Sequence, residues 1–387
     1  MDLLLLTVIA VVALALLFDF SNGFHDAANS IATVVATKAL SPLQAVWLAA
    51  VCNFAAYFFV GTAVANTVSK TVNKGYISVA VIFAALMSAI VWNYLTWFVG
   101  MPSSSSHAII GGLVGAGLAV GGTDAVGWSS VKKVVYAIAL SPAVAFSVAA
   151  VGAGLVWVLQ KVTRWNDDAA PFKGLQIVSA AAVSFGHGAN DAQKTMGVIA
   201  AVLAGGGYLA ADASGKFPVP TWVALSAYAA IAIGTVWGGW RIIETMGMKL
   251  TNLNARVGVA ANIGATTAIF GATSLGIPIS TTHAAASSVV GAGAASGRGA
   301  NWKVVGEMVI AWVVTIPATT ALAFVFFKMT QLPGVLDVIV TGAVTIAIGV
   351  AIAWAMTHSI THKDIEAELK PEEPVILPTD KASATSA

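Results

Sequence analysis

Long apolar stretches, separated by short polar clusters, follow one another along most of this 387-residue chain. Several of them, at residues 76–100, 131–160 and 334–357, reach the roughly 20 residues that an α-helix needs to cross about 30 Å of hydrocarbon. Because lipid offers no hydrogen-bonding groups, each stretch must satisfy its own backbone polar groups, which favours a bundle of helices. The pattern therefore predicts an all-α polytopic membrane protein.

We expect about twelve transmembrane or re-entrant segments, some of them too short to span a bilayer. The short stretches 26–37, 105–121, 191–205 and 282–296 are rich in Gly, Ala and Ser, and each begins at a polar cluster, which is typical of interrupted or re-entrant helices. The expected segments are 3–20, 26–37, 43–65, 76–100, 105–121, 131–160, 174–186, 191–205, 219–240, 256–276, 282–296, 304–328 and 334–357.

The composition supports this interpretation and excludes some classes of partner. Hydrophobic residues make up 58% of the chain and charged residues only 9%, whereas a soluble domain carries about 25% charged residues. The expected surroundings are therefore a lipid bilayer, and the expected location is the plasma membrane. The net charge is only +2 and the chain has no long basic run, so nucleic acid is not an expected partner.

Polar stretches divide the chain into regions. The most polar internal stretch, 161–173, predicts a linker between a first membrane repeat at 1–160 and a second at 174–357. After His358 the chain becomes charged and Pro-rich, so residues 358–387 are expected to form a disordered tail.

Two motifs occur twice, in the same order. Gly23-Phe-His-Asp-Ala-Ala-Asn29 matches Gly188-Ala-Asn-Asp-Ala-Gln-Lys194, and Met101-Pro-Ser-Ser-Ser-Ser-His107 matches Ile277-Pro-Ile-Ser-Thr-Thr-His283. The offsets are 165 and 176 residues, and an insertion within the stretch 205–220 accounts for the difference. This order predicts a duplicated architecture, of the kind that many transporters have.

The carboxylates of the first motif are candidates for cation binding. A charge inside a membrane segment costs a few kcal/mol, so Asp26 and Asp191 need a partner or a watery cavity. Lys194 lies one helical turn after Asp191, so simple neutralisation of Asp191 stays open. Asp26 has only His25 beside it, which favours a bound cation, either Na⁺ or H⁺.

The hydroxyl groups of the second motif are candidates for anion binding. Each cluster follows a proline and opens a Gly- or Ala-rich helix, whose first N–H groups have no partner within the helix. These N–H groups and the added hydroxyls suit a tetrahedral oxyanion, although such residues also serve as plain helix caps. The hydroxyl residues are Ser104, Ser105, Ser106, Ser280, Thr281 and Thr282.

Histidines and asparagines accompany both motifs. The histidines lack the spacing of a metal site, so we expect them to support the site by hydrogen bonding or protonation, with no metal beyond possible Na⁺ and no cofactor. Two asparagines in apolar segments, Asn53 and Asn262, are either packing amides or cation ligands. The histidines are His25, His107, His187 and His283.

At these motifs the sequence resembles the inorganic phosphate transporter (PiT) family, in its bacterial branch, over residues 1 to about 357. The resemblance implies two inverted repeats, a phosphate bound at the midplane beside cation sites, alternating access and commonly a homodimer. His25 stands where the family signature has Asn, and Gln193-Lys194 replaces Ala-Asn in the second copy.

Carried over residue by residue, the resemblance implies two groups of ligands. Asp26 and Asp191 would be the carboxylates that couple the cation, the six hydroxyl residues would hold phosphate, and Asn29 and Gln193 would bind phosphate or the cation. To these we add Asn190, Asn53 and Asn262 as candidate cation ligands, and Lys194, which departs from the signature, as a positive charge for phosphate.

The predicted function is symport of inorganic phosphate with H⁺ or Na⁺, and the alternative is a sulfate permease of the same superfamily. An anion channel would not need buried carboxylates. An intramembrane hydrolase is disfavoured because adjacent residues such as Ser106 and His107 point to different helix faces, and no GxSxG motif occurs. The chain is therefore not expected to be an enzyme.

Overall fold

The computed structural model describes residues 2–212 and 216–369, and within these residues the chain is all-helical, as predicted. The longer helices are α1 (Leu3–Ala36), α2 (Pro42–Ala55), α4 (Val79–Phe98), α5 (Ser105–Gly121), α6 (Trp128–Thr163), α7 (Ala170–Gly205), α8 (Thr221–Trp237), α10 (Ala255–Ser274), α11 (Thr281–Ala295), α12 (Trp302–Met329) and α13 (Leu336–Thr357). The short elements are η1 (Ala56–Phe58), α3 (Ala63–Val68), η2 (Lys74–Tyr76), η3 (Gly122–Ala125), α9 (Trp240–Glu244), the π-helical turn η4 (Thr245–Lys249) and α14 (His362–Glu368).

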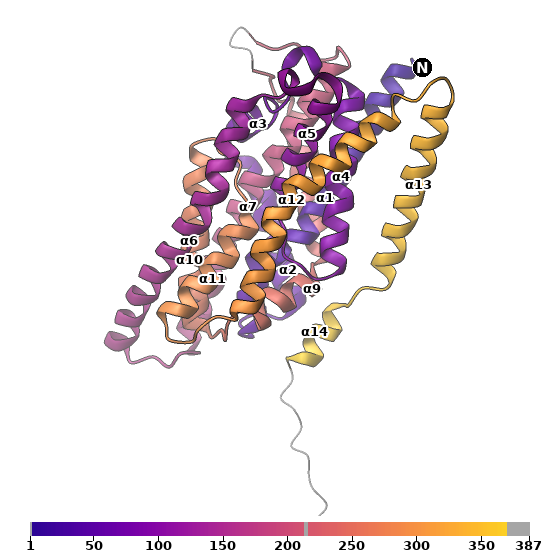
Figure 1. Cartoon of the computed structure of the whole chain (residues 1–387). Helices are drawn as coiled ribbons and strands as arrows, with labels where there is room; N and C mark the ends of the chain where they lie inside the picture. The colour runs from indigo at the N-terminus through magenta and orange to yellow at the C-terminus, as the bar shows by residue number, and fades with distance from the viewer. Residues whose placement is uncertain (1, 213–215, 370–387) are drawn as a thin grey trace, which may run out of the picture.

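Most of the long helices run side by side along one axis of the molecule (Figure 1). Among the described residues, seven helices are long and apolar enough to cross a membrane, and the number is eight if α8 and the following pair α9–η4, bent by 68°, form one span. The helix α13 stands at the edge of the bundle, and its side chains are mostly exposed (Figure 1). The architecture is therefore that of a multi-pass membrane protein.

The two helix starts predicted at residues 26 and 191 are wrong. Asp26 lies within the continuous helix α1, and Asp191 lies within the continuous helix α7. A buried polar side chain does not interrupt a helix, because the peptide groups of the helix remain bonded to one another. The ranges 3–20 and 26–37 thus form one helix, and the ranges 174–186 and 191–205 form another. The starts predicted at the hydroxyl clusters are confirmed, since α5 begins at Ser105 and α11 begins at Thr281.

The helices of the two halves correspond in order and packing. The series α4, α5 and α6, of 20, 17 and 36 residues, matches α10, α11 and α12, of 20, 15 and 28 residues. Helix α5 packs against α12 and α11 packs against α6, while α1 packs against α8 and α7 packs against α2. The two halves are therefore interleaved rather than separate.

The glycines that open the two copies of the first motif permit close helix crossings. A Cβ atom at Gly23 would lie 2.2 Å from the backbone oxygen of Ile231 on α8, and one at Gly188 would lie 2.4 Å from the backbone oxygen of Asn53 on α2. A side chain at either position would collide with the neighbouring backbone, so only glycine allows this approach. The polar residues that follow each glycine are consequently held in the interior of the bundle.

The predicted linker is shorter in the structure, because α6 ends at Thr163 and α7 begins at Ala170. Part of the predicted tail is also ordered. Residues 362–368 form α14, which contacts α2 and α9 and buries Ile365 completely. This helix places an apolar side chain against the bundle, which the charged composition of the tail did not indicate. The rest of the predicted tail, 370–387, lies outside the described residues.

The linker between the halves is held by Asp167. Its carboxylate accepts hydrogen bonds from Gln160 (2.7 Å) and Asn254 (2.7 Å) and forms ion pairs with Arg256 (3.0 Å) and Arg298 (2.9 Å). Partial burial alone would raise the pKa of Asp167, but hydrogen bonds from Gln160 and Arg256 and the positive charge of Arg256 lower it further than burial raises it. Asp167 thus joins α6, α10 and the loop that follows α11.

We expect the substitution Asp167→Asn to destabilise the protein by about 0.5–1 kcal/mol at neutral pH, because the pairs with Arg256 and Arg298 are partly exposed. A carboxylate whose pKa is lowered by folding stabilises the protein above its unfolded pKa, and this contribution disappears as the pH falls through the folded pKa. Thermal unfolding in detergent at neutral and acidic pH measures the effect. The difference from the wild type should shrink in acid, whereas the exposed control Asp124→Asn should show no such change.

Candidate functional site

Two buried carboxylates lie together where the N-termini of α5 and α11 meet the middle of α1 and α7. Ligand atoms of Asp26, His187 and Asp191 all lie within 4.8 Å of one another. Asp26 is 1% exposed and Asp191 is fully buried. The tertiary structure therefore brings together the carboxylates of both motif copies, which are 165 residues apart in the chain.

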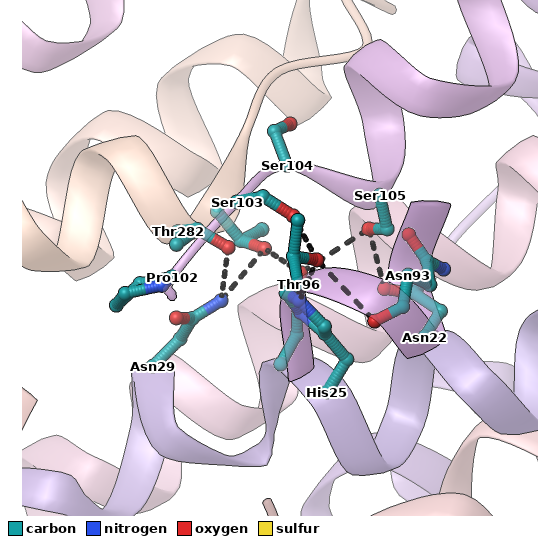
Figure 2. A network of polar contacts seen from close by, with 12 residues as sticks. Asn22, His25, Asn29, Asn93, Thr96, Pro102, Ser103, Ser104, Ser105 and Thr282 are labelled. Atoms are coloured by element: carbon teal, nitrogen blue, oxygen red, sulfur yellow. Dashed lines mark hydrogen bonds and ion pairs between the residues drawn. The ribbon is translucent and has the colours of Figure 1, made fainter. Parts of the chain in front are cut away.

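Asp26 is held by neutral hydrogen-bonding groups and by His25. Its Oδ1 lies 2.6 Å from Nδ1 of His25, and its Oδ2 accepts hydrogen bonds from Ser105 Oγ (3.2 Å) and Thr281 Oγ1 (3.3 Å). The other ring nitrogen of His25 lies 3.1 Å from Thr96 Oγ1, and Figure 2 shows how Thr96 and Ser103 surround it. This arrangement fixes the imidazole and leaves the Asp26 charge without a Lys or Arg partner among the described residues.

Asp191 is paired with a lysine of the same helix. The Nζ atom of Lys194 lies 2.5 Å from Asp191 Oδ1 and donates also to Ser106 Oγ (2.5 Å) and to the backbone oxygen of Ile279 (3.0 Å). On the other side, Nε2 of His187 lies 3.5 Å from Asp191 Oδ2. The ion pair that the sequence left open is therefore present, and it contacts the first turn of α5 and the residue that precedes the N-cap of α11.

The hydroxyl clusters divide into caps and site groups. Ser104 and Ser280 cap α5 and α11 by accepting from the backbone N–H groups of His107 (3.2 Å) and His283 (3.1 Å), and the Ser104 hydroxyl points away from the network in Figure 2. The hydroxyls that follow each cap face the motif helices. Asp26 is contacted by Ser105 and by Thr281. Ser106 contacts Lys194, and Thr282 contacts Asn29.

The contacts of the two motif copies correspond across the halves. Asn29 donates to Thr282 Oγ1 at 3.0 Å, and at the equivalent position of the second motif Lys194 donates to Ser106 Oγ at 2.5 Å. Each motif helix thus contacts the hydroxyl-capped helix of the other half. One half presents a neutral amide and the other an ammonium group, so the two halves are chemically different.

Asn22 is a site residue that the sequence analysis missed. Its amide oxygen accepts a hydrogen bond from Ser105 Oγ (2.6 Å), beside which it lies in Figure 2. Its amide nitrogen donates to Asp191 Oδ2 (3.3 Å), so Asn22 connects the two motif helices. A signal was present, because Asn22, Asp26 and Asn29 are spaced by four and three residues and share one helix face.

Other predicted ligands lie outside this cluster in the described structure. Gln193 accepts from the backbone N–H of Val64 at the start of α3 (2.9 Å). Asn190 holds the segment before α11 by donating to the backbone oxygen of Ile277 (3.3 Å) and accepting from Ile279 N–H (3.3 Å). These amides support neighbouring backbone, and their predicted roles as ligands stay predictions.

Asn53 and Asn262 make no hydrogen bond with either carboxylate among the described residues. Asn53 Oδ1 lies 3.2 Å from His187 Nδ1, so it orients the imidazole that faces Asp191. Asn262 accepts from Thr33 Oγ1 (3.1 Å) and donates to Ser179 Oγ (3.1 Å), which links α1, α7 and α10.

His107 and His283 form a pair of their own. Both are buried, their ring centroids lie 4.4 Å apart, and Trp312 stacks on His283 at 3.9 Å. Their ring nitrogens make no hydrogen bonds among the described residues. The pair joins the first turns of α5 and α11 directly behind the hydroxyl groups.

The charges and dipoles of the cluster define what it can bind. With neutral histidines, the carboxylates of Asp26 and Asp191 and the ammonium of Lys194 leave a net charge of −1. The N-termini of α5 and α11 bring partial positive charge and N–H donors to the same place. A cation beside the carboxylates would therefore favour an anion at the helix ends.

A membrane-spanning helix bundle with a charged polar site at its centre defines a membrane transporter. The chain belongs to the phosphate transporter family, whose profile matches residues 22–323. The chain is therefore a multi-pass plasma-membrane protein of a transporter family and is not an enzyme, in agreement with the sequence analysis.

Individual relatives and one solved structure are similar over most of their length. A protein of Rhizobium meliloti named "Probable low-affinity inorganic phosphate transporter" is 48% identical over 81% of this chain and 94% of that protein. A Bacillus subtilis protein of the same name is 42% identical over 86% of this chain and all of that protein. A structure titled "The sodium-dependent phosphate transporter" has a TM-score of 0.74 at 24% identity, over 85% of this chain and all of that one, and it supports the fold.

Proposed function

We propose that this protein carries inorganic phosphate across the plasma membrane together with a cation, either H⁺ or Na⁺. The names of its bacterial relatives support phosphate as the substrate. The observation that carries the proposal is the buried cluster of Asp26, Asp191 and Lys194 at the N-termini of α5 and α11. A site of net charge −1 would repel phosphate unless a cation were bound beside it, so the two ligands should bind together.

Each ligand has residues suited to it. A cation would lie against the carboxylates of Asp26 and Asp191, with His187 at the same place. Phosphate would be held by the first-turn N–H groups of α5 and α11, by their hydroxyls and by Lys194, whose Nζ already reaches both helix ends. Asn29 is the equivalent donor from the first motif.

Transport would follow from alternating access between inverted repeats. In Figure 1, α6 runs from the upper end of the bundle to the lower end, whereas its counterpart α12 runs from the lower end to the upper one. Opposite directions of matched helices support inversion of the two halves. The central side chains are at most 5% exposed, Asn29 being the most accessible, which fits an occluded conformation between the two open ones. The homodimer implied by the sequence resemblance stays a prediction.

Uptake of labelled phosphate into liposomes that contain the purified protein tests the proposal. We expect accumulation against a phosphate gradient when an inward Na⁺ or H⁺ gradient is imposed, and little accumulation when both gradients are absent. Excess sulfate distinguishes the alternative substrate, because the O–H group of phosphate can donate a hydrogen bond to an acceptor in the site, whereas sulfate has no such donor. Absence of uptake under either gradient would refute symport, and suppression by sulfate would favour the sulfate permease.

A further inference from the structure

A third buried carboxylate lies on α1 outside the cluster described above. Asp19 is fully buried, and neither of its oxygens has a hydrogen-bond partner among the described residues. It also forms no ion pair with any described residue. Asp19 precedes Asp26 by seven residues, so both carboxylates lie on the same face of α1, two turns apart.

The surroundings of Asp19 connect it with the site. The neutral polar groups beside its carboxylate are Asn22 on its own helix and Thr195 on α7. The charges of Asp191 and Lys194 on α7 also act on it. Asn22 in turn donates to Asp191 and accepts from Ser105, so one amide links Asp19 to the cluster.

The remaining titratable neighbour is Tyr228 on α8, whose buried hydroxyl has no hydrogen-bond partner among the described residues. Asp191, Lys194 and Tyr228 are the titratable groups that act on Asp19 from the helices packed against it. The one positive charge among them, on Lys194, is already bound by Asp191, Ser106 and the backbone of Ile279. An ionised Asp19 therefore has no counter-charge of its own among the described residues.

A carboxylate that is buried without a counter-charge of its own is more stable as the neutral acid than as the anion. The neutral side chains beside Asp19, those of Asn22 and Thr195, compensate only part of the cost of burying a negative charge. Burial without a partner is thus the arrangement of a residue that binds a proton. An apolar residue of similar size would fill the same space without this cost. No ion pair with a described residue accounts for a carboxylate at this position.

We infer that Asp19 is a proton-binding residue of the transport cycle and that its proton is carried together with phosphate. With Asp19 ionised, the group formed by Asp19, Asp26, Asp191 and Lys194 has a net charge of −2, and with Asp19 protonated it has a net charge of −1. A proton on Asp19 thereby strengthens the binding of phosphate, and bound phosphate strengthens the binding of the proton by the same free energy. This inference rests on the proposed function and adds a proton site distinct from the cation site at Asp26 and Asp191.

The equilibrium accumulation of phosphate in proteoliposomes tests the inference. The external pH is kept constant so that the protonation state of external phosphate does not change, and the membrane potential is clamped at zero. The pH of the liposome lumen is either equal to the external pH or one unit higher. Each symported proton multiplies the accumulation ratio by about ten per pH unit. We expect Asp19→Asn to reduce the response to the pH gradient by about tenfold relative to the wild type, and Asp19→Glu to restore it.

Asp124→Asn, on the exposed turn η3, is the matched control and should respond as the wild type does. If the response of Asp19→Asn equals that of the wild type, the inference is wrong although phosphate transport stands. If the wild type accumulates no phosphate under any gradient, the proposed function itself fails.

A second measurement covers the case in which Asp19→Asn does not transport. Phosphate raises the unfolding temperature of a protein that binds it, and the pH dependence of this rise can be compared in detergent between the two proteins. A weaker pH dependence in Asp19→Asn supports a proton site at this residue. An unchanged pH dependence overturns it.

Discussion

Replacing Asp26 with asparagine should lower cation-driven phosphate accumulation at least about thirtyfold, since losing one partner of a buried charge interaction costs about 2–5 kcal/mol. Of the two carboxylates in the cluster, Asp26 is the one that has no Lys or Arg partner among the described residues, so it is the more free to hold a cation. Asparagine keeps the size of the side chain and an oxygen that accepts from Ser105 and Thr281. Labelled phosphate uptake under an imposed cation gradient measures the loss.

The exposed Asp124→Asn is the control for this substitution as well. A normal unfolding temperature together with lost accumulation would place Asp26 in the coupling site. Accumulation equal to that of the wild type would contradict a cation site at Asp26 and would leave Asp191 to be tested alone.

The substitution Lys194→Met should destabilise the protein by about 3–5 kcal/mol, because it leaves the fully buried Asp191 without its counter-charge. Methionine fills a similar volume, so the loss would come mainly from charge. The double substitution Asp191→Asn with Lys194→Met removes both charges and should recover much of the stability. Unfolding in detergent is measured for the wild type, for the single variants Lys194→Met and Asp191→Asn, and for the double variant.

This double-mutant comparison separates a charge pair from independent packing effects. If the two substitutions are simply additive, the short contact between Asp191 and Lys194 contributes no coupling energy, and the lysine must be retained for phosphate binding alone. Transport should be absent in both proteins that lack Lys194, since its ammonium is the charged donor at the ends of α5 and α11.

Much of the fold could be predicted from the chain because it depends on local pattern. The long apolar stretches became α4, α6, α12 and α13 to within a few residues. The hydroxyl clusters marked the starts of α5 and α11, because a serine before a helix accepts from the N–H three residues later wherever it occurs. The same local rule misled at Asp26 and Asp191, since a polar side chain is also tolerated inside a helix when a neighbouring helix buries it.

Some contacts of the candidate site could be predicted from local spacing, and others depend on how the helices pack. Lys194 and Asp191 could be paired from their spacing, because both lie on one helix. Gln193 could not be placed, since whether it faces the carboxylates or α3 depends on how α7 rotates against its neighbours. Asn22 and Asp19 lacked a matching residue in the second motif, so repetition did not draw attention to them.

The sequence by itself determined that this is a membrane helix bundle with two motifs that each occur twice, a hydroxyl-capped pair of helices and one carboxylate in each copy of the first motif. Apolar length, capping and repetition are properties of the chain that do not depend on long-range contacts. Only the tertiary structure decided that Asp26 and Asp191 meet, that Thr281 of one half contacts the aspartate of the other, and that Asp19 is buried without a partner. These facts depend on how α1, α7, α5 and α11 cross, which close backbone contacts at glycines such as Gly23 and Gly188 make possible.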